Sequence, residues 1–272
     1  MAEVRWIYDL TIFLYAASVL FYFNDFLQSN RKVNRLAFGL LIVVWALQTA
    51  FFVSQTVMKA YFPVITLFET LFFYSWVLVS LSLAIHYFFR IDLLVFFTNI
   101  IGFVVLVMSM FLPETPIVAV SSVLTSELLL THVTLAMFSY GAFSLSMIFS
   151  AMYLLQHKML KERRWTPLLR RLPSLDQLEG YAYRMNMLGV PMLLLSIVLG
   201  IIWGKMVLPE KFLLDSKVVL SLLVLASYSF WLYKRFRDTM QMRRMAQWNV
   251  LAFLLLLINF LGITTSTFHS WW

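Results

Sequence analysis

Two histidines, His132 and His269, are the side chains in this sequence whose types and positions best suit metal binding. A neutral imidazole nitrogen is an axial ligand of haem iron and a common ligand of other transition metals. Each histidine lies at the end of a long apolar stretch, so two helices could carry the pair to similar depth at one face of a membrane. We interpret the pair as a candidate metal site. The alternative interpretation is two separate polar residues at the membrane interface.

The nature of the metal depends on which other ligands join the pair. Two histidines fill both axial positions of haem, whereas zinc normally takes at least three protein ligands. Glu69 could supply a third ligand, so the number of potential ligands is also compatible with a zinc site. Trp76 follows Glu69 by seven residues and shares its helix face. We interpret His86 as an interfacial anchor and His157 as a solvated residue beside a basic loop.

The composition shows what kind of protein must position these residues. Of the 272 residues, 62% are hydrophobic and 12% are charged, whereas soluble domains have about 25% charged residues. So few charges cannot cover a water-soluble surface, which excludes a soluble enzyme. The lack of cysteine excludes disulfides, iron–sulfur clusters and thiolate zinc sites. We attribute the net charge of +8 to basic loops that face anionic lipid, not to nucleic-acid binding.

Long apolar stretches predict an all-α fold, a polytopic membrane protein with about eight transmembrane helices. A helix needs about 20 apolar residues to cross the hydrocarbon layer. The predicted spans are 6–23, 34–55, 64–89, 93–112, 128–156, 185–207, 218–233 and 250–266. We expect a single domain over residues 1–272. No internal repeat, broken helix pair or run of midplane charges is apparent, so an ion channel or secondary transporter ranks below the other functional classes.

The distribution of basic residues predicts the orientation of the chain. All but five of the 21 lysines and arginines fall on one side if the N-terminus is outside the cell. Basic residues collect in cytoplasmic loops, so we predict an N-out, C-out arrangement. His132 and His269 then lie near the outer face. The largest loop, residues 157–184, is then cytoplasmic and basic.

This loop has two interpretations. Ser174 and Gln177 have the spacing of a helix capping box, so a helix is predicted to begin at Leu175 and to continue into the sixth span. In the first interpretation, the basic residues between Lys158 and Arg171 are an orientation signal that contacts lipid and has no further role. In the second interpretation, these basic residues form a docking surface for a cytosolic partner.

Four stretches of the chain have the pattern of a known family. They are Phe68-Glu69-Thr70-Leu71-Phe72-Phe73-Tyr74-Ser75-Trp76; His132 with Ser139, Tyr140 and Phe143; Tyr183-Arg184 with residues 188–191 and 200–204; and His269-Ser270. Because of these four stretches, residues 64–272 resemble the integral-membrane cytochrome c assembly proteins. These proteins handle haem during the biogenesis of c-type cytochromes. The resemblance is greatest to the HemX branch of that family, which accompanies haem-biosynthesis enzymes.

The resemblance implies roles for particular residues. His132 and His269 match the two external histidines that ligate haem in the family, which implies one haem b near the outer face. Trp203 matches the tryptophan that precedes the outer haem-binding loop. Trp203, Asp215 and Glu69 would line the pocket or support the ligating histidines, and Trp76 is a further candidate for contact with haem. The loop motif W-D-P-K-E is reduced to Asp215 and Lys217 here. A full role in presenting haem to an apocytochrome is therefore not expected.

Two functions from different classes follow from these implications. The first is a haem-binding membrane protein linked to haem biosynthesis, without catalysis of its own, in the plasma membrane of a bacterium. The second is a regulatory adaptor that controls the level of glutamyl-tRNA reductase through the loop between Lys158 and Arg171. An outer haem site would favour the first function. A cytosolic partner that depends on the basic loop would favour the second.

Overall fold

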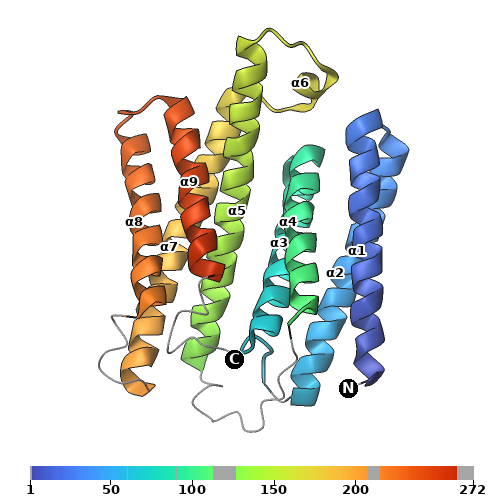
Figure 1. Ribbon diagram of the computed structural model, residues 1–272, viewed down its shortest axis with the longest axis vertical. Coiled ribbons are helices and arrows are strands. Elements are labelled where there is room, and N and C mark those ends of the chain that lie inside the picture. Colours follow the sequence, from blue (N-terminus) through green and yellow to red (C-terminus); the bar gives the residue numbers. More distant parts are fainter. Residues whose placement is uncertain (1, 60, 90, 113–126, 208–214, 262–272) are drawn as a thin grey trace. The chain divides into compact units, whose positions relative to one another are not determined.

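The computed structural model describes residues 2–59, 61–89, 91–112, 127–207 and 215–261. The described residues form nine helices and no strand (Figure 1). The helices are α1 (Ala2–Gln28), α2 (Arg31–Lys59), α3 (Leu67–Phe89), α4 (Asp92–Met110), α5 (Glu127–Lys161), α6 (Pro167–Arg171), α7 (Leu175–Val207), α8 (Ser216–Phe236) and α9 (Met242–Leu261). The prediction of an all-α fold is confirmed.

Eight of these helices, all except the short α6, are long and apolar enough to cross a membrane. The predicted number of transmembrane helices is therefore confirmed. The last span was predicted to begin at residue 250, whereas α9 already begins at Met242. Arg243 and Arg244 lower the hydropathy of the first turn of α9 without interrupting its backbone hydrogen bonds. Hydropathy marks the apolar part of a helix, not its end.

The chain divides into two compact units. Unit 1 is Met1–Thr125, with helices α1 to α4, and unit 2 is Ser126–Trp272, with helices α5 to α9. Most of the candidate site residues that the structure describes belong to unit 2. That residues 1–272 act as one functional domain stays a prediction.

Buried polar contacts hold the four helices of unit 1 together. The Tyr15 hydroxyl of α1 donates a hydrogen bond to Asn99 Oδ1 of α4 at 2.9 Å. Ser75 Oγ of α3 donates to the Gly102 carbonyl of α4, also at 2.9 Å. A methyl group at Gly102 would collide with the Tyr15 hydroxyl. A glycine is therefore needed where α1 and α4 approach each other, as small residues are at helix contacts in membranes.

In unit 2, polar side chains at seven-residue intervals join α5 to the antiparallel α7. His132 Nδ1, Ser139 Oγ and Ser146 Oγ each donate a hydrogen bond to a backbone carbonyl of α7. The acceptors are the carbonyls of Ser196 at 2.6 Å, Gly189 at 2.9 Å and Ala182 at 2.9 Å. A seven-residue period keeps one face of a helix against its partner. We call these three contacts the α5–α7 ladder, and His132 forms its last rung.

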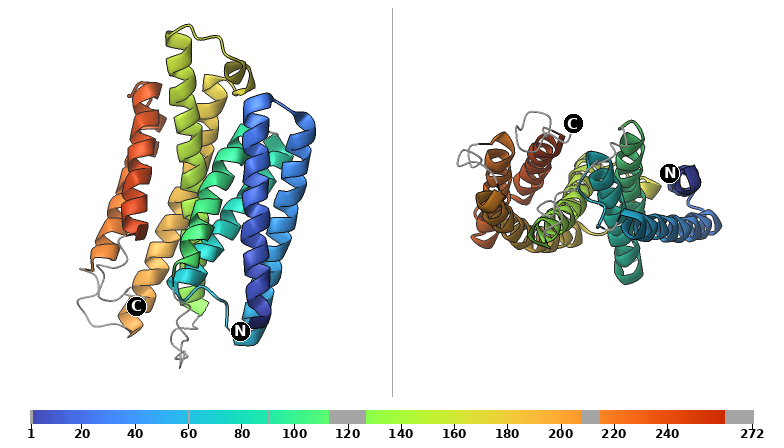
Figure 2. Two further views of the ribbon diagram at one scale, coloured as in Figure 1. Left: turned by 45° about the vertical axis from the view of Figure 1, so that its right-hand side comes forward. Right: turned by 90° about the horizontal axis from the view of Figure 1, so that it is seen from below.

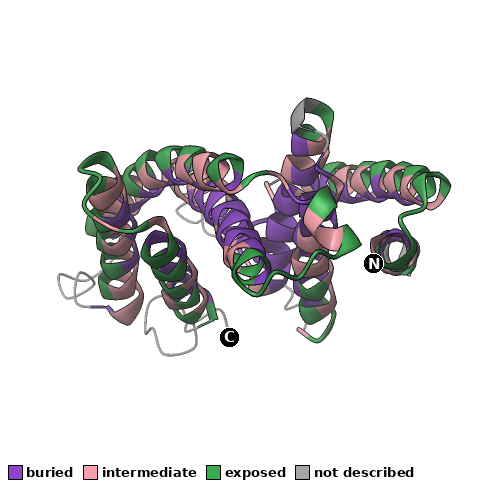
Figure 3. Ribbon diagram, turned by 90° about the horizontal axis from the view of Figure 1, so that it is seen from above, coloured by how far each residue is buried: buried purple, intermediate pink, exposed green. Residues whose placement is uncertain are grey.

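Helices α8 and α9 form a second antiparallel pair that packs beside α5 and α7 (Figures 1 and 2). Asn249 Nδ2 of α9 donates to Ser146 Oγ and Ser150 Oγ of α5, both at 2.7 Å. Asn259 Nδ2 donates to the Tyr140 hydroxyl of α5 at 3.2 Å. Contacts on several sides leave α5 the most buried long helix of unit 2. Figure 3 colours the ribbon by burial.

The two ends of unit 2 have different chemistry. The histidine end comprises the start of α5, the end of α7, the start of α8 and the end of α9. The loop end comprises the opposite ends of these helices, with α6. At the loop end, Gln177 Oε1 accepts from the Ser174 backbone N–H at 3.1 Å, and Ser174 Oγ accepts from the Gln177 N–H at 3.3 Å. The capping box is thus confirmed, and α7 continues from Leu175 to Val207.

Candidate functional site

His132 lies near the start of α5 and is held by a reciprocal contact with Ser196 of α7. Its Nδ1 atom is 2.6 Å from the Ser196 carbonyl oxygen and 3.1 Å from Ser196 Oγ. In return, Ser196 Oγ donates to the His132 carbonyl oxygen at 2.9 Å. The imidazole therefore has a fixed orientation, set by backbone groups of both helices.

This contact also decides which ring nitrogen carries the proton. A carbonyl oxygen can only accept a hydrogen bond, so His132 Nδ1 must be the protonated nitrogen of the neutral ring. The Nε2 atom then keeps its lone pair, and no hydrogen bond joins it to any of the described residues. A histidine that binds a metal usually donates its other N–H to a carbonyl or carboxylate in this way. The donor chemistry of His132 therefore fits an axial ligand.

Gly200 gives the imidazole of His132 the space it occupies. A β-carbon at Gly200 would lie 2.7 Å from Cε1, 2.8 Å from Nδ1 and 3.3 Å from Nε2 of the ring. These separations are shorter than ordinary van der Waals contact, so any side chain at position 200 would displace the ring. Gly200 and Ser196 are one helical turn apart on α7, and together they form the seat of His132.

The start of α8 brings charge to the same end of unit 2. Asp215 is buried and caps α8, because its side chain accepts a hydrogen bond from the Lys217 backbone N–H at 2.9 Å. Lys217 lies in the first turn of α8, so its ammonium group belongs to the histidine end of unit 2 as well. A histidine, a lysine and a buried carboxylate therefore lie at the same end of unit 2.

The remaining predicted residues of unit 2 stand as follows. Trp203 is half-buried near the end of α7, seven residues after Ser196 and therefore on the same helix face. His269 lies outside the described residues. The last described residue of α9 is Leu261, at the histidine end. Ligation of one haem by both histidines stays a prediction.

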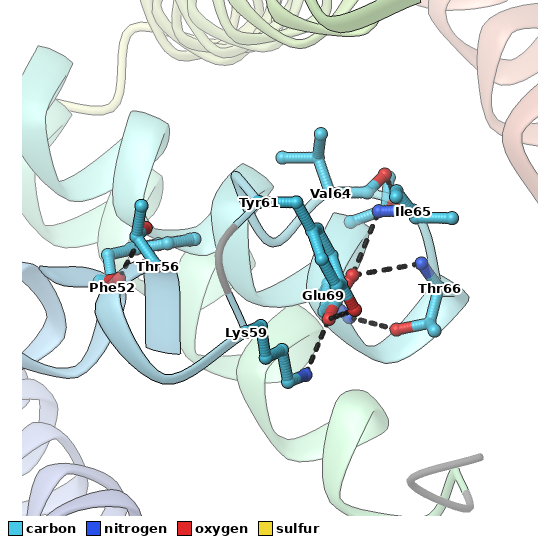
Figure 4. Close-up of polar contacts among 9 residues, drawn as sticks. Phe52, Thr56, Lys59, Tyr61, Val64, Ile65, Thr66 and Glu69 are labelled. Atoms are coloured by element: carbon cyan, nitrogen blue, oxygen red, sulfur yellow. Dashed lines mark hydrogen bonds and ion pairs between the residues drawn. The ribbon is translucent and has the colours of Figure 1, made fainter. Parts of the chain in front are cut away.

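Glu69, in unit 1, has a local role that its sequence motif did not reveal (Figure 4). Its two carboxylate oxygens accept from Lys59 Nζ at 2.7 Å and from the backbone N–H groups of Ile65 at 2.9 Å and Thr66 at 3.1 Å. Thr66 Oγ1 accepts from the Glu69 N–H at 3.2 Å, so the two residues cap the start of α3. The carboxylate could bind a metal only after losing part of this network.

Tyr61 completes the surroundings of this carboxylate. Its hydroxyl donates to Glu69 Oε1 at 3.2 Å. Burial raises the pKa of the Tyr61 phenol, and the nearby negative charge and hydrogen bond of Glu69 raise it further. Tyr61 therefore stays protonated as a hydrogen-bond donor well above neutral pH. The network orders the segment that joins α2 to α3.

Trp76 and His86 have local partners as well. The Trp76 indole donates to Thr49 Oγ1 of α2 at 3.0 Å, so this ring fastens α3 to α2. The His86 ring lies 4.2 Å from the Phe38 ring, and its Nδ1 is 3.6 Å from Asp92 Oδ1. The described residues contain no group of three or more histidine, cysteine, aspartate or glutamate side chains that could hold a metal.

Ser196, the partner of His132, was not predicted from the sequence. A signal for it was present, because residues 132, 139 and 146 of α5 and residues 196, 189 and 182 of α7 recur at the same seven-residue interval. Antiparallel helices with matching periods place such positions opposite one another. Gly200 was noted in the sequence as part of a stretch, but its contact with the ring of His132 could only be seen in the structure.

These features define a polytopic, all-helical membrane protein with a fixed histidine at one end of its second unit. Residues 64–269 match the family described as cytochrome C assembly protein. The chain belongs to this family. It is 90% identical over 272 residues to a protein named HemX from Brevibacillus brevis, with 100% of both chains covered. It is also 47% identical over 261 residues to protein HemX of Bacillus subtilis, with 95% of both chains covered.

A more distant relative lies in the cytochrome c branch of the family. The chain is 24% identical over 251 residues to the cytochrome c biogenesis protein CcsA of Guillardia theta, with 86% of this chain and 83% of that protein covered. The resemblance to the cytochrome c assembly family and to its HemX branch is therefore confirmed.

Proposed function

We propose that this protein binds and handles haem in the plasma membrane of a bacterium, as a non-catalytic component linked to haem biosynthesis. One haem b is held at the histidine end of unit 2, with His132 and His269 as its two axial ligands. Membership of the cytochrome c assembly family supports the involvement of haem. The name of the relative from Guillardia theta, a cytochrome c biogenesis protein, supports it as well.

The geometry of His132 is the observation that carries this proposal. The hydrogen bond of 2.6 Å from Nδ1 to the Ser196 carbonyl leaves the lone pair on Nε2, the form of imidazole that ligates iron. Ser196 and Gly200 orient the ring before the ligand arrives, which lowers the entropy lost on binding.

Other residues at the histidine end would contact the rest of the ligand. Haem contributes an iron atom that accepts two nitrogen ligands and two propionates that carry negative charge. Lys217, in the first turn of α8 at the histidine end, would attract a propionate through its positive charge. Trp203 offers an aromatic face for the porphyrin, and Asp215 fixes the start of α8 by capping it. In this arrangement the protein binds and orients haem.

Absorption spectra of the purified protein test the proposal. We expect the wild-type protein to show the Soret band of a low-spin, six-coordinate haem. His132→Ala and His269→Ala should each give a five-coordinate, partly high-spin haem, and the double variant should lose the haem. His157→Ala is the matched control, because His157 lies at the loop end beside Tyr153 and should leave the spectrum unchanged. A low-spin spectrum preserved in both single variants and the double variant would refute ligation by this pair.

A second candidate function rests on the loop end of unit 2. There α5 extends beyond the start of α9, and the segment that follows carries Arg163 and a Trp165 side chain that is 80% exposed. An exposed tryptophan among arginines is typical of a binding surface for another protein. This protein would then act as an adaptor that controls the level of glutamyl-tRNA reductase.

The adaptor function has its own test. The variant in which Arg163, Arg164, Arg170 and Arg171 become glutamine should lower the effect of the protein on the cellular level of glutamyl-tRNA reductase. Its haem spectrum should stay unchanged, because these residues lie at the loop end. Its orientation should also survive, because other basic residues remain at that end. If the reductase level is the same with the variant as with the wild type, the loop acts only as an orientation signal.

A further inference from the structure

A second basic segment at the loop end of unit 2 is the short connection between α8 and α9. Residues 234–244 contain five basic side chains and one acidic side chain, Asp238. Arg235 pairs with Glu179 of α7, and its Nη2 lies 3.0 Å from Glu179 Oε2. The four remaining cations have no carboxylate within ion-pair distance among the described residues. We call Lys234, Arg237, Arg243 and Arg244 the turn cations.

The backbone of this connection has a defined conformation. The Thr239 N–H donates to the Lys234 carbonyl at 3.3 Å, and the Asp238 N–H donates to the Arg235 carbonyl at 3.2 Å. Asp238 adopts a left-handed conformation with a φ angle of 49°. These are the features of a Schellman motif, which ends α8 in a fixed geometry. The turn cations are therefore presented from an ordered turn.

Aromatic rings support two of the four turn cations. Lys234 Nζ lies 5.3 Å from the centre of the Phe230 ring, and the Arg237 guanidinium lies 5.8 Å from the centre of the Tyr233 ring. Tyr233 and Phe236 are exposed on α8. Aromatic rings beside cations are typical of the level of the lipid headgroups, where the rings reach the acyl chains and the cations reach the phosphates.

The length of α8 places the turn at this level. Its 21 residues span about 31 Å, which matches the hydrocarbon layer of about 30 Å. The connection between α5 and α7 lies farther out. Tyr153 of α5 and Met242 of α9 line the same small pocket, so they are level with each other. Helix α5 continues from Tyr153 to Lys161, about 12 Å more at 1.5 Å per residue, and Figure 1 shows α5 extending past the turn.

We propose that the α8–α9 turn is a binding site for an anionic phospholipid headgroup, with the turn cations as its ligands. The phosphodiester of the lipid accepts hydrogen bonds from Arg237, Arg243 and Arg244. The exposed rings of Tyr233 and Phe236 contact the upper part of the acyl chains. The site is independent of haem binding, because it lies at the opposite end of unit 2.

Lipid titration of the full-length protein, followed by native mass spectrometry, tests this site. The probes are phosphatidylglycerol, phosphatidylcholine and inorganic phosphate. We expect the wild-type protein to retain phosphatidylglycerol in preference to phosphatidylcholine. The variant R237Q/R243Q/R244Q should bind phosphatidylglycerol about 10- to 100-fold more weakly. Tyr233→Leu should weaken binding about 2- to 5-fold, because the ring no longer supports Arg237.

A matched control distinguishes lipid binding by a specific site from lipid attraction by the net charge of the protein. The variant R31Q/K32Q/R35Q removes three positive charges from exposed positions at the start of α2, where no described aromatic ring lies beneath a cation. It should bind phosphatidylglycerol like the wild type. The variant R237K/R243K/R244K should retain most of the binding, and circular dichroism should show unchanged helix content in all variants.

Several results would overturn the proposal. One is an equal loss of phosphatidylglycerol binding in both glutamine variants, which would show that the lipid responds only to the overall charge of the protein. Another is equal retention of phosphatidylglycerol and phosphatidylcholine. Displacement of the lipid by millimolar inorganic phosphate would indicate a site for a free anion. Loss of a cytosolic protein partner with unchanged lipid binding would make the turn a protein docking surface.

Discussion

Replacing Gly200 by alanine tests the geometry of the histidine site most directly. The new methyl group would lie 2.7 Å from Cε1 and 2.8 Å from Nδ1 of the His132 ring, so the ring must move. The ring is held by the hydrogen bond of 2.6 Å from Nδ1 to the Ser196 carbonyl. Movement of the ring breaks this bond and turns Nε2 away from its ligand position. We therefore expect Gly200→Ala to lower both stability and haem binding.

The structure provides a control on the same helix. A methyl group at Gly180 of α7 would meet no atom within 4 Å. Both substitutions gain about 0.5–1 kcal/mol from the higher helix propensity of alanine. Gly200→Ala also loses a hydrogen bond and leaves buried polar groups without a partner, which costs about 1–3 kcal/mol. The two variants should therefore differ by about 1–3 kcal/mol in the free energy of unfolding, with Gly180→Ala the more stable.

Two measurements decide the outcome. Unfolding in detergent micelles by sodium dodecyl sulfate gives the difference in free energy between the two variants. The absorption spectrum of the protein as purified gives the haem content and the spin state of the iron. If Gly200→Ala is as stable as Gly180→Ala and keeps the wild-type spectrum, the ring of His132 does not lie against Gly200, and the proposed seat is wrong.

Three further predictions concern topology, cytochrome c maturation and Glu69. Tags at both termini should be accessible from outside intact cells and a tag at Trp165 only from inside; a cytoplasmic C-terminus would contradict this. The protein should fail to restore c-type cytochromes in a strain without a full assembly protein, because three positions of the W-D-P-K-E motif differ; rescue would contradict it. Glu69→Gln should lower the free energy of unfolding by about 2–4 kcal/mol with an unchanged haem spectrum. A changed spectrum with unchanged stability would instead assign Glu69 to the haem pocket.

Much of the fold could be predicted from the sequence because the hydropathy of a membrane helix depends on its own residues alone. The eight long helices and the helix start at Leu175 required only apolar length and a capping motif. The true start of α9 at Met242 could not be found in this way, because its first turn carries charge at a helix end that the apolar window does not cover. The division into two units depends on contacts between helices, which hydropathy does not report.

The site was predictable only in part. His132 was identified by its residue type and its depth, and Asp215 and Lys217, which the sequence had noted, lie at the same end of unit 2 at the start of α8. The tautomer of His132 could not be predicted, because it is set by the Ser196 carbonyl, 64 positions along the chain. The place of Glu69 in the pocket wall stays a prediction, and its hydrogen bonds to Lys59, Ile65 and Thr66 could not be predicted from the motif. A sequence motif can single out a residue, but it does not show which groups that residue contacts in the folded protein.

The α5–α7 ladder makes it possible to separate the structural role of His132 from its proposed ligand role. The Ser139 and Ser146 rungs each use a hydroxyl proton to bind a carbonyl of α7. His132 makes the same kind of contact through Nδ1, but it also has a second nitrogen, Nε2. Asparagine at position 132 would keep an N–H donor near the place of Nδ1 and would lack the second nitrogen. We therefore expect His132→Asn to retain the rung and to lose the ligand.

The comparison of two substitutions at position 132 then distinguishes the two interpretations of this residue. His132→Asn should keep the wild-type stability within about 0.5 kcal/mol, whereas His132→Ala should lose about 1–3 kcal/mol because the hydrogen bond between α5 and α7 is lost. If His132 is an axial ligand, both variants should show the same high-spin haem spectrum despite their different stabilities. If it is only a rung of the ladder, the spectrum of His132→Asn should equal that of the wild type. A low-spin Soret band in His132→Asn would therefore leave the histidine with a structural role alone.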